Sequence, residues 1–180
     1  MLNEAQIMKE FEDAEAILRG HFILSSGLHS DTYLQCARVL MNPMRAGVLC
    51  ATLASKLHDK FGHGAFDLVV APAMGGVVVG YEMGRQLGIE TIFCERENGK
   101  FTLRRGFRIE PGARILLVED VVTTGKSSLE TVTCIKEHGG EVIAEASLID
   151  RSGGTHNLPF PLVSLLTLDV KSYQPDQLPD

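Results

Sequence analysis

The residues with the clearest chemical potential lie in the stretch RILLVEDVVTTGKSS, residues 114–128. An apolar run of buried-strand type leads into two adjacent acids, Glu119 and Asp120, and a hydroxyl-rich segment follows. Backbone amides from Thr123 to Ser127, at the start of a predicted helix, would form a cradle for phosphate. Carboxylates directly before that cradle would repel phosphate, so they must face a cation or hydroxyl groups. The stretch therefore predicts a sugar-phosphate ligand, with the sugar hydroxyls on the acids.

Two common nucleotide-binding motifs do not fit the sequence. A P-loop needs a glycine five positions before Gly125, where this chain has Asp120. Gly75, Gly76 and Gly80 do not have the G-x-G-x-x-G spacing of a dinucleotide-binding turn. A simpler alternative stays open at this point, in which the acids end a strand at the surface and the serines and threonines cap a helix.

The elements that position this stretch alternate between apolar strands and helices. Strands of buried type are predicted at residues 66–72, 89–95, 114–118, 141–149 and 162–168. Helices are predicted at residues 1–20, from Pro43 with Asn42 as its cap, from Gly76 to Leu87 and from Ser127 to His138. Such alternation is typical of one α/β domain with a mostly parallel sheet covered by helices on both faces.

Two turn-rich segments lie between these elements. Residues 21–40 predict short strands around Gly27. Residues 96–113 predict a mobile loop with hairpin arms, and basic side chains recur along it and just beyond it, at Arg96, Lys100, Arg104, Arg105, Arg108 and Arg114. A local basic cluster of this kind suits a small anionic ligand.

A glycine at every fourth position marks the helix predicted around residue 80: Gly76, Gly80, Gly84 and Gly88. In an apolar segment this spacing would indicate membrane packing, but Glu82 and Arg85 lie within it. We therefore expect a helix that lies unusually close to the sheet or to a partner subunit.

Composition and charge exclude several classes of protein. The net charge of −6 argues against a dedicated binder of nucleic acid or anionic membrane. The N-terminal stretch is too acidic for a secretory or transit signal, and no apolar run is long enough to span a bilayer, so a cytoplasmic location is expected. The four cysteines have no metal-site or redox-motif spacing and are expected to be reduced.

A resemblance to a known family adds to this interpretation. The string ILLVEDVVTTGKSS resembles the phosphoribosyl-pyrophosphate motif of the type I phosphoribosyltransferases, and the wider chain resembles the orotate phosphoribosyltransferases within them. The resemblance runs from HFILSSGLHSDTYLQC through APAMGG and ERENGKFTLRRGF to LIDRSGG, about residues 21–154.

This resemblance implies a fold and a reaction. The expected fold is the type I phosphoribosyltransferase fold in a single domain of residues 1–180, with a hood formed by residues 1 to about 40 and the C-terminal segment. The implied reaction joins orotate to the ribose 5-phosphate of 5-phosphoribosyl 1-pyrophosphate and releases pyrophosphate. Mg²⁺ is implied as cofactor, bound mainly through the substrate rather than by side chains. A homodimer whose mobile loop serves the neighbouring site is also implied.

The same resemblance assigns site residues. Lys100, Glu119 and Asp120 are the candidate catalytic residues. The residues implied to bind phosphoribosyl pyrophosphate are Ala73, Met74, Gly75, Arg96, Lys100, Glu119, Asp120, Val121, Val122, Thr123, Thr124, Gly125, Lys126 and Ser127. Thr123 and Arg151 would bind orotate, whose carboxylate suits a bidentate guanidinium. The alternative for Arg151 is a surface ion pair with Asp150.

The sequence departs from the family pattern at several positions, which leaves the pyrophosphate contacts open. Ser25 and Gly75 stand where many relatives carry lysine, the mobile loop has no histidine, and the aromatic residue expected beside the base is shifted to Tyr33. Two other functions stay open at this point. One is transfer to another base, such as a purine, and the other is a non-catalytic regulator that binds RNA on the same fold.

Overall fold

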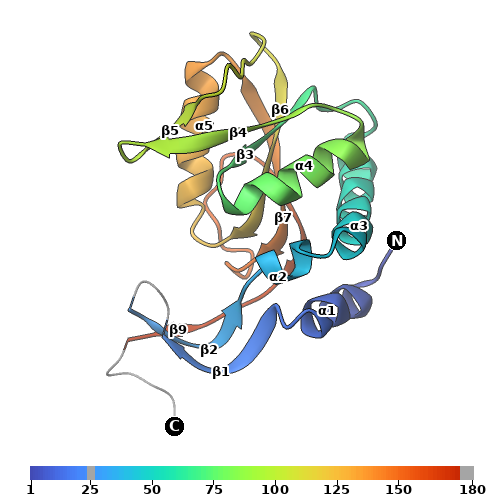
Figure 1. Cartoon of the computed structure of the whole chain (residues 1–180), viewed down its shortest axis with the longest axis vertical. Coiled ribbons are helices and arrows are strands. Elements are labelled where there is room, and N and C mark those ends of the chain that lie inside the picture. Colours follow the sequence, from blue (N-terminus) through green and yellow to red (C-terminus); the bar gives the residue numbers. More distant parts are fainter. Residues whose placement is uncertain (24–26, 175–180) are drawn as a thin grey trace.

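The computed structural model of the chain describes residues 1–23 and 27–174. Its main sheet has the strand order β5-β4-β3-β6-β7-β8, in which β5 is antiparallel to β4 and the other neighbours are parallel (Figure 1). The strands are β3 (Leu68–Pro72), β4 (Thr91–Glu97), β5 (Lys100–Leu103), β6 (Arg114–Val122), β7 (Glu141–Asp150) and β8 (Leu162–Thr167). The predicted mostly parallel sheet is confirmed.

Helices cover both faces of this sheet. Helices α3 (Pro43–Phe61) and α4 (Gly75–Leu87) lie on one face and α5 (Lys126–Glu137) on the other (Figure 1). Alternate side chains of β6 enter the two cores, so Leu116 packs on the α3 and α4 side and Leu117 on the α5 side. The sheet is therefore buried on both faces, as its uninterrupted apolar strands predicted.

Helix α3 begins as its sequence predicted. The side chain of Asn42 accepts hydrogen bonds from the backbone amides of Met44 and Arg45, and Pro43 occupies the first helical position. Leu49, Leu53 and Leu57 are fully buried along its inner face. None of the described helices combines the length and apolarity that a membrane-spanning helix needs.

The N-terminal region forms a small separate sheet below the main one (Figure 1). It contains β1 (Ile17–Ile23), β2 (His29–Leu34) and β9 (Ser172–Tyr173), with α1 (Glu4–Asp13) before it and α2 (Ala37–Leu40) after it. The predicted helix over residues 1–20 is too long, because α1 ends at Asp13 and Leu18 lies in β1 opposite Tyr33. Backbone pairing with β2 replaces the last helical turns that the apolar spacing predicted.

The strand that carries the two acids is longer than predicted. The sequence predicts it at residues 114–118, yet β6 continues to Val122 because β7 pairs with it as far as Asp150. Glu119 and Asp120 therefore lie within the strand and not in a turn after it. Their side chains consequently follow the alternation of a strand and point to opposite faces of the sheet.

The glycines of α4 let this helix lie against the sheet, one of the two positions that their spacing predicted. A Cβ on Gly76 would lie 2.9 Å from the carbonyl oxygen of Val118, and one on Gly80 would lie 2.9 Å from Cβ of Ala71. Such distances are shorter than real side chains tolerate. Helix α4 thus holds the loop that precedes it directly over the end of β6.

Candidate functional site

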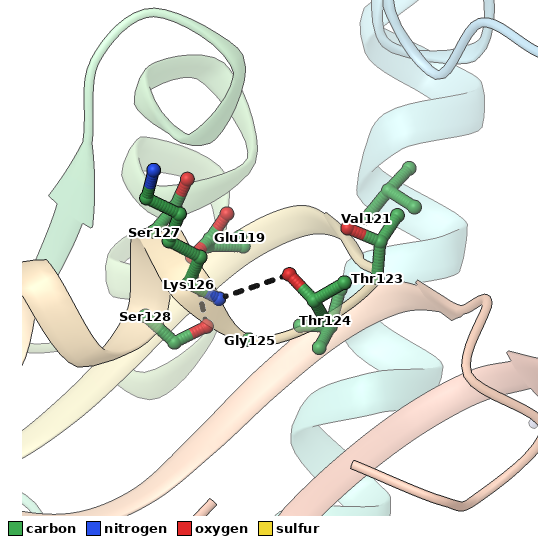
Figure 2. Close-up of a pocket in the computed structure, with 9 residues that line it drawn as sticks. Glu119, Val121, Thr123, Thr124, Gly125, Lys126, Ser127 and Ser128 are labelled. Atoms are coloured by element: carbon green, nitrogen blue, oxygen red, sulfur yellow. Dashed lines mark hydrogen bonds between the residues drawn. The ribbon is translucent and has the colours of Figure 1, made fainter. Parts of the chain in front are cut away.

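A pocket of about 250 Å³ opens where β6 ends and α5 begins. Its lining is Glu119, Val121, Val122, Thr123, Thr124, Gly125, Lys126, Ser127 and Ser128, which Figure 2 shows around the turn. With the exception of Asp120, the predicted run from Glu119 to Ser127 therefore surrounds one cavity. The carboxyl ends of parallel strands are the usual position of ligand sites in such sheets.

The turn between β6 and α5 has the form of an anion cradle. Gly125, with φ 75°, adopts the left-handed conformation directly before the first residue of α5, and a Cβ there would lie 2.9 Å from Leu158 Cδ2. The amide of Lys126 donates to Thr124 Oγ1 over 3.4 Å (Figure 2). The first amides of a helix have no acceptor within the helix, and the helix dipole adds positive potential there. The turn can therefore hold a phosphate group.

The two adjacent acids serve different sides of the site. Glu119 points toward α5, where its Oε1 accepts a hydrogen bond from Ser128 Oγ over 3.0 Å. Asp120 points toward α4, and its carboxylate lies directly below Gly75, where a Cβ would come within 2.7 Å of Oδ1. The predicted loop Ala73, Met74 and Gly75 thus meets the predicted acid Asp120. The absence of a side chain at Gly75 leaves room for this contact.

Burial changes the acidity of both carboxyls. Burial raises the pKa of Glu119 to about 7; the charge of Asp120 acts in the same direction, while the Ser128 hydroxyl and the Arg96 guanidinium oppose it. Burial also raises the pKa of Asp120, against hydrogen bonds from the backbone amides of Val121 and of Asp120 itself. A ligand with positive charge or hydroxyl donors would therefore stabilise the ionised form of both carboxyls.

Of the basic residues in the predicted mobile loop, Arg96 and Lys100 lie on the hairpin of β4 and β5, which projects from one edge of the sheet (Figure 1), and Arg104 and Arg105 directly follow it. Arg96 pairs with Glu130 of α5 and stacks on Phe101, 4.1 Å from the ring centroid. Arg104 pairs with Glu97, and Arg105 pairs with Glu95. Within the described residues, Lys100 makes no ion pair. Lys100 is exposed at the start of β5 and does not line the pocket of its own chain.

Arg151 follows the last residue of β7, beside the acidic strand. Its backbone amide donates to the carbonyl oxygen of Val122 over 2.8 Å, which places it next to the pocket-lining turn. Burial lowers the pKa of its guanidinium. The neighbouring Asp150 accepts two hydrogen bonds from Ser152, one from its amide over 2.8 Å and one from its hydroxyl over 2.6 Å. Ser25, the hood position that departs from the family pattern, lies outside the described residues.

One residue near the pocket, Glu145, was not identified from the sequence, and Ser128 was expected only as one of the hydroxyl donors to phosphate. Ser128 lies in the first turn of α5 and contacts Glu119, and its hydroxyl also lies 2.8 Å from Oε1 of Glu145 on β7. Glu145 is fully buried. A usable signal was present, because Glu145 is an acid between two alanines in a strand of the apolar type that is buried on both faces.

Comparison with known proteins agrees with this geometry. Residues 40–176 match the phosphoribosyl transferase domain. The chain is 57% identical over 178 residues to the orotate phosphoribosyltransferase of Rhizorhabdus wittichii, a match that covers 99% of this chain and 90% of the relative. It superposes on the crystal structure of orotate phosphoribosyltransferase from Aeropyrum pernix with a TM-score of 0.73 at 25% identity, covering 90% of this chain and 93% of that one.

A solved phosphoribosyltransferase that acts on adenine shares only the fold. Adenine phosphoribosyltransferase from Saccharomyces cerevisiae superposes with a TM-score of 0.72 at 16% identity, covering 88% of this chain and 99% of that one. The full-length match to the Rhizorhabdus protein is far stronger in sequence. The phosphate cradle after β6, the loop over Asp120 and these alignments lead to one conclusion: the chain belongs to the orotate phosphoribosyltransferases, within the phosphoribosyl transferase domain family.

Proposed function

We propose that this protein transfers the ribose 5-phosphate group of 5-phosphoribosyl 1-pyrophosphate to orotate, giving orotidine 5'-monophosphate and pyrophosphate in pyrimidine biosynthesis. The observation that carries the proposal is the passage from Glu119 and Asp120 directly into the anion cradle before α5. Such a site places hydroxyl-binding carboxylates at a fixed distance from a phosphate-binding turn. A ribose 5-phosphate offers both groups in that order.

The chemistry follows from the charges at this site. The orotate nitrogen loses its proton to solvent or to the departing pyrophosphate and gives its electron pair to C1 of the ribose, while the C1–O bond breaks and its electron pair leaves with pyrophosphate. Positive charge develops on the ribose ring in the transition state, as in glycoside hydrolysis. A carboxylate beside the ring stabilises that charge more in the transition state than in the ground state. Glu119 and Asp120 have this role, and basic groups such as Arg96 and Lys100 stabilise the leaving pyrophosphate.

The carboxyl arrangement suits Mg²⁺ that is bound mainly through the substrate. Glu119 and Asp120 point to opposite faces of β6, so they do not converge on one ion. Mg²⁺ usually takes few protein ligands and completes its shell with phosphate oxygens and water. When bound to the pyrophosphate, it neutralises charge on the leaving group. We assign no side chain as its direct ligand.

The proposed reaction is tested by mixing the protein with orotate, 5-phosphoribosyl 1-pyrophosphate and Mg²⁺ and following the absorbance of orotate. We expect orotate to be consumed and pyrophosphate to be released in equal amounts. Parallel reactions with adenine, guanine and uracil test transfer to another base. Pyrophosphate release with a purine but not with orotate would contradict the proposal, and so would RNA binding without any transfer.

Arg151 is proposed to bind the orotate carboxylate. For Arg151→Ala we expect apparent orotate affinity to fall by about 1.5–3 kcal/mol, the scale of a hydrogen bond to a charged group, with affinity for phosphoribosyl pyrophosphate little changed. Titration calorimetry with each substrate measures both. Arg114→Ala is the matched control, because Arg114 lies at the opposite end of β6 and pairs with Asp67 over 2.7 Å. A selective loss of phosphoribosyl pyrophosphate affinity would instead place Arg151 on the phosphate side.

Gly75 is proposed to keep the pyrophosphate loop in contact with Asp120. A Cβ at this position would lie 2.7 Å from Oδ1 and 3.0 Å from Oδ2 of Asp120, so alanine must displace that carboxylate. We expect Gly75→Ala to lower kcat about tenfold or more, because small misplacements of a catalytic group are costly. Steady-state kinetics measure this, and Gly47→Ala on α3, where a Cβ would meet its nearest atoms at 3.5 Å, is a control for the loss of a glycine. Unchanged kcat would show that Asp120 tolerates displacement.

We infer that two copies of this chain form a dimer through an apolar surface on α2, α3 and α4. Large apolar side chains are strongly exposed there: Met41 at 78%, Met44 at 78%, Val48 at 47%, Met74 at 82%, Val78 at 52% and Tyr81 at 71%. Helices α3 and α4 lie side by side (Figure 1), and Met74 belongs to the loop over Asp120. Contiguous apolar patches on a protein surface mark interaction sites. A partner bound here would reach the active site.

The remaining proposals concern the extent of the domain and its location. We propose that residues 1–180 act as one functional unit, since β9 pairs with β2 and so joins the C-terminal segment to the hood.

The cysteines bear on the location of the protein. All four are free and buried: Cys36, Cys50, Cys94 and Cys134. Free thiols suit a reducing compartment, which supports the proposed cytoplasmic location.

A further inference from the structure

Three buried side chains from three elements meet below the pocket. Ser128 Oγ of α5 lies 3.0 Å from Oε1 of Glu119 on β6 and 2.8 Å from Oε1 of Glu145 on β7. The exposed fractions are 1% for Ser128, 8% for Glu119 and 0% for Glu145. Figure 2 shows Ser128 and Glu119 at the base of the turn that forms the cradle. The serine hydroxyl thus connects an acid at the pocket to an acid in the core.

The number of hydrogens shared by Ser128, Glu119 and Glu145 shows that one of the two carboxyls is protonated. A serine hydroxyl carries one hydrogen and can donate to one of the two carboxyls only. If Glu119 and Glu145 were both ionised, one of the two short oxygen contacts would hold no hydrogen, and two negative charges would be buried together. One of the two carboxyls must therefore be protonated and donate to Ser128 Oγ, whose own hydrogen then goes to the other.

The surroundings assign the proton to Glu145. Glu145 has no contact with the pocket, and its Oε2 has no hydrogen-bond partner within the described residues, so an ionised carboxylate would be poorly compensated there. Glu119 opens to the pocket and is within electrostatic range of the Arg96 guanidinium. Burial first, and then the charge of Glu119, raise the pKa of Glu145 to about 8, which favours its neutral form at neutral pH.

We propose that Glu145 is a positioning residue of the active site: as a neutral acid it donates to Ser128, whose hydroxyl donates to the Glu119 carboxylate and fixes it toward the ribose. This inference rests on the proposed function, because it assigns Glu119 to the ribose. The chain runs from the core through the first turn of α5 to the pocket. The neutral acid therefore directs the only hydrogen of Ser128 to the acid that meets the substrate.

The arrangement predicts a specific dependence on pH. The charged groups near Glu119 are Asp120 on the same strand, Arg96 on β4 and Glu145 on β7, and those near Glu145 are Glu119 and Asp150. Because the pKa of Glu145 is raised, its proton is present at neutral pH and is lost as the pH rises through about 8. The new carboxylate then competes for the hydrogen of Ser128 and repels Glu119. We therefore expect kcat to fall as the pH rises through about 8.

Three variants separate positioning from a merely structural role. Glu145→Gln keeps a neutral side chain with an N–H donor, so we expect kcat at neutral pH to stay within about threefold of wild type. The loss of activity at alkaline pH that is due to ionisation of Glu145 should disappear in this variant. Glu145→Leu has neither donor nor charge, so we expect kcat to fall about tenfold, the scale of one lost hydrogen bond, with KM for phosphoribosyl pyrophosphate little changed. Ser128→Ala interrupts the same chain and should have a similar effect on kcat.

The protonation state is measured independently of activity by infrared spectroscopy of the whole protein without substrate. We expect wild type at neutral pH to show the carbonyl band of a buried neutral carboxylic acid, and Glu145→Gln to lack it. A wild-type enzyme that turns over orotate but has no such band overturns this inference. It is also overturned if Glu145→Gln loses activity at alkaline pH as the wild type does, or if Glu145→Leu keeps the wild-type kcat. The band together with no orotate turnover would contradict the proposed function and leave the shared proton intact.

Discussion

Asp120→Asn is expected to lower kcat by about 100-fold or more while KM for either substrate changes little. Asparagine has nearly the same shape and preserves the packing of this side chain under Gly75. It removes the negative charge that stabilises the positive charge developing on the ribose, and it replaces one acceptor oxygen by an NH2 donor. An interaction that grows in the transition state affects kcat more than it affects substrate binding.

The control for this prediction is Asp59→Asn. Asp59 is exposed on α3, outside the pocket at the end of β6, so the same chemical change there should leave both constants unaffected. Steady-state kinetics, with the concentration of each substrate varied in turn, give kcat and KM for both variants in the same buffer. Equal effects of the two substitutions on kcat would remove Asp120 from the reaction. A rise in KM without loss of kcat would make it a binding residue only.

The turn between β6 and α5 was predictable because its requirements are local. A buried strand, a short hydroxyl-rich turn and a helix start are set by neighbouring residues, and the turn from Thr123 to Gly125 lies where the sequence placed it. Asn42 as a cap is equally local. Both features depend on the backbone geometry of a few neighbouring residues, which the residue types in a single sequence indicate directly.

The features that the sequence analysis missed depend on strand pairing. Leu18 continues the helical spacing of Ile7 and Phe11, yet pairing with Tyr33 draws it into β1. Pairing of β6 with β7 likewise extends β6 through the acids, which sends Glu119 and Asp120 to opposite faces. Register between distant segments decides both outcomes, and apolar periodicity alone carries no information on register.

The opposite orientation of the two acids gives the site two separately supported halves. Glu119 depends on α5 through Ser128, while Asp120 depends on the loop before α4 through Gly75. Substitutions at Ser128 and at Gly75 have no shared contact in the described structure and should act additively on kcat. Neighbouring acids in one motif therefore have different supporting residues.

Lys100→Ala is expected to reduce activity strongly, because Lys100 is proposed to neutralise the leaving pyrophosphate. Three arginines on or directly after its hairpin, Arg96, Arg104 and Arg105, are held by Glu130, Glu97 and Glu95. Lys100 makes no ion pair within the described residues and lies outside the pocket of its own chain, so it is available to a neighbouring site. Lys136→Ala, an exposed lysine on α5, is the matched control and should keep wild-type activity.

Subunit exchange between Lys100→Ala and Asp120→Asn tests whether the hairpin acts on the partner's site. Random mixing makes about half of the dimers mixed, because a two-fold interface does not discriminate between the variants. If Lys100 serves the neighbouring site, each mixed dimer carries both defects in one site and leaves the other intact. Activity then recovers to about a quarter of wild type, half of the dimers times half of their sites. If Lys100 serves its own site, every site keeps one defect and mixing restores nothing, and full activity of Lys100→Ala alone would remove this residue from the mechanism.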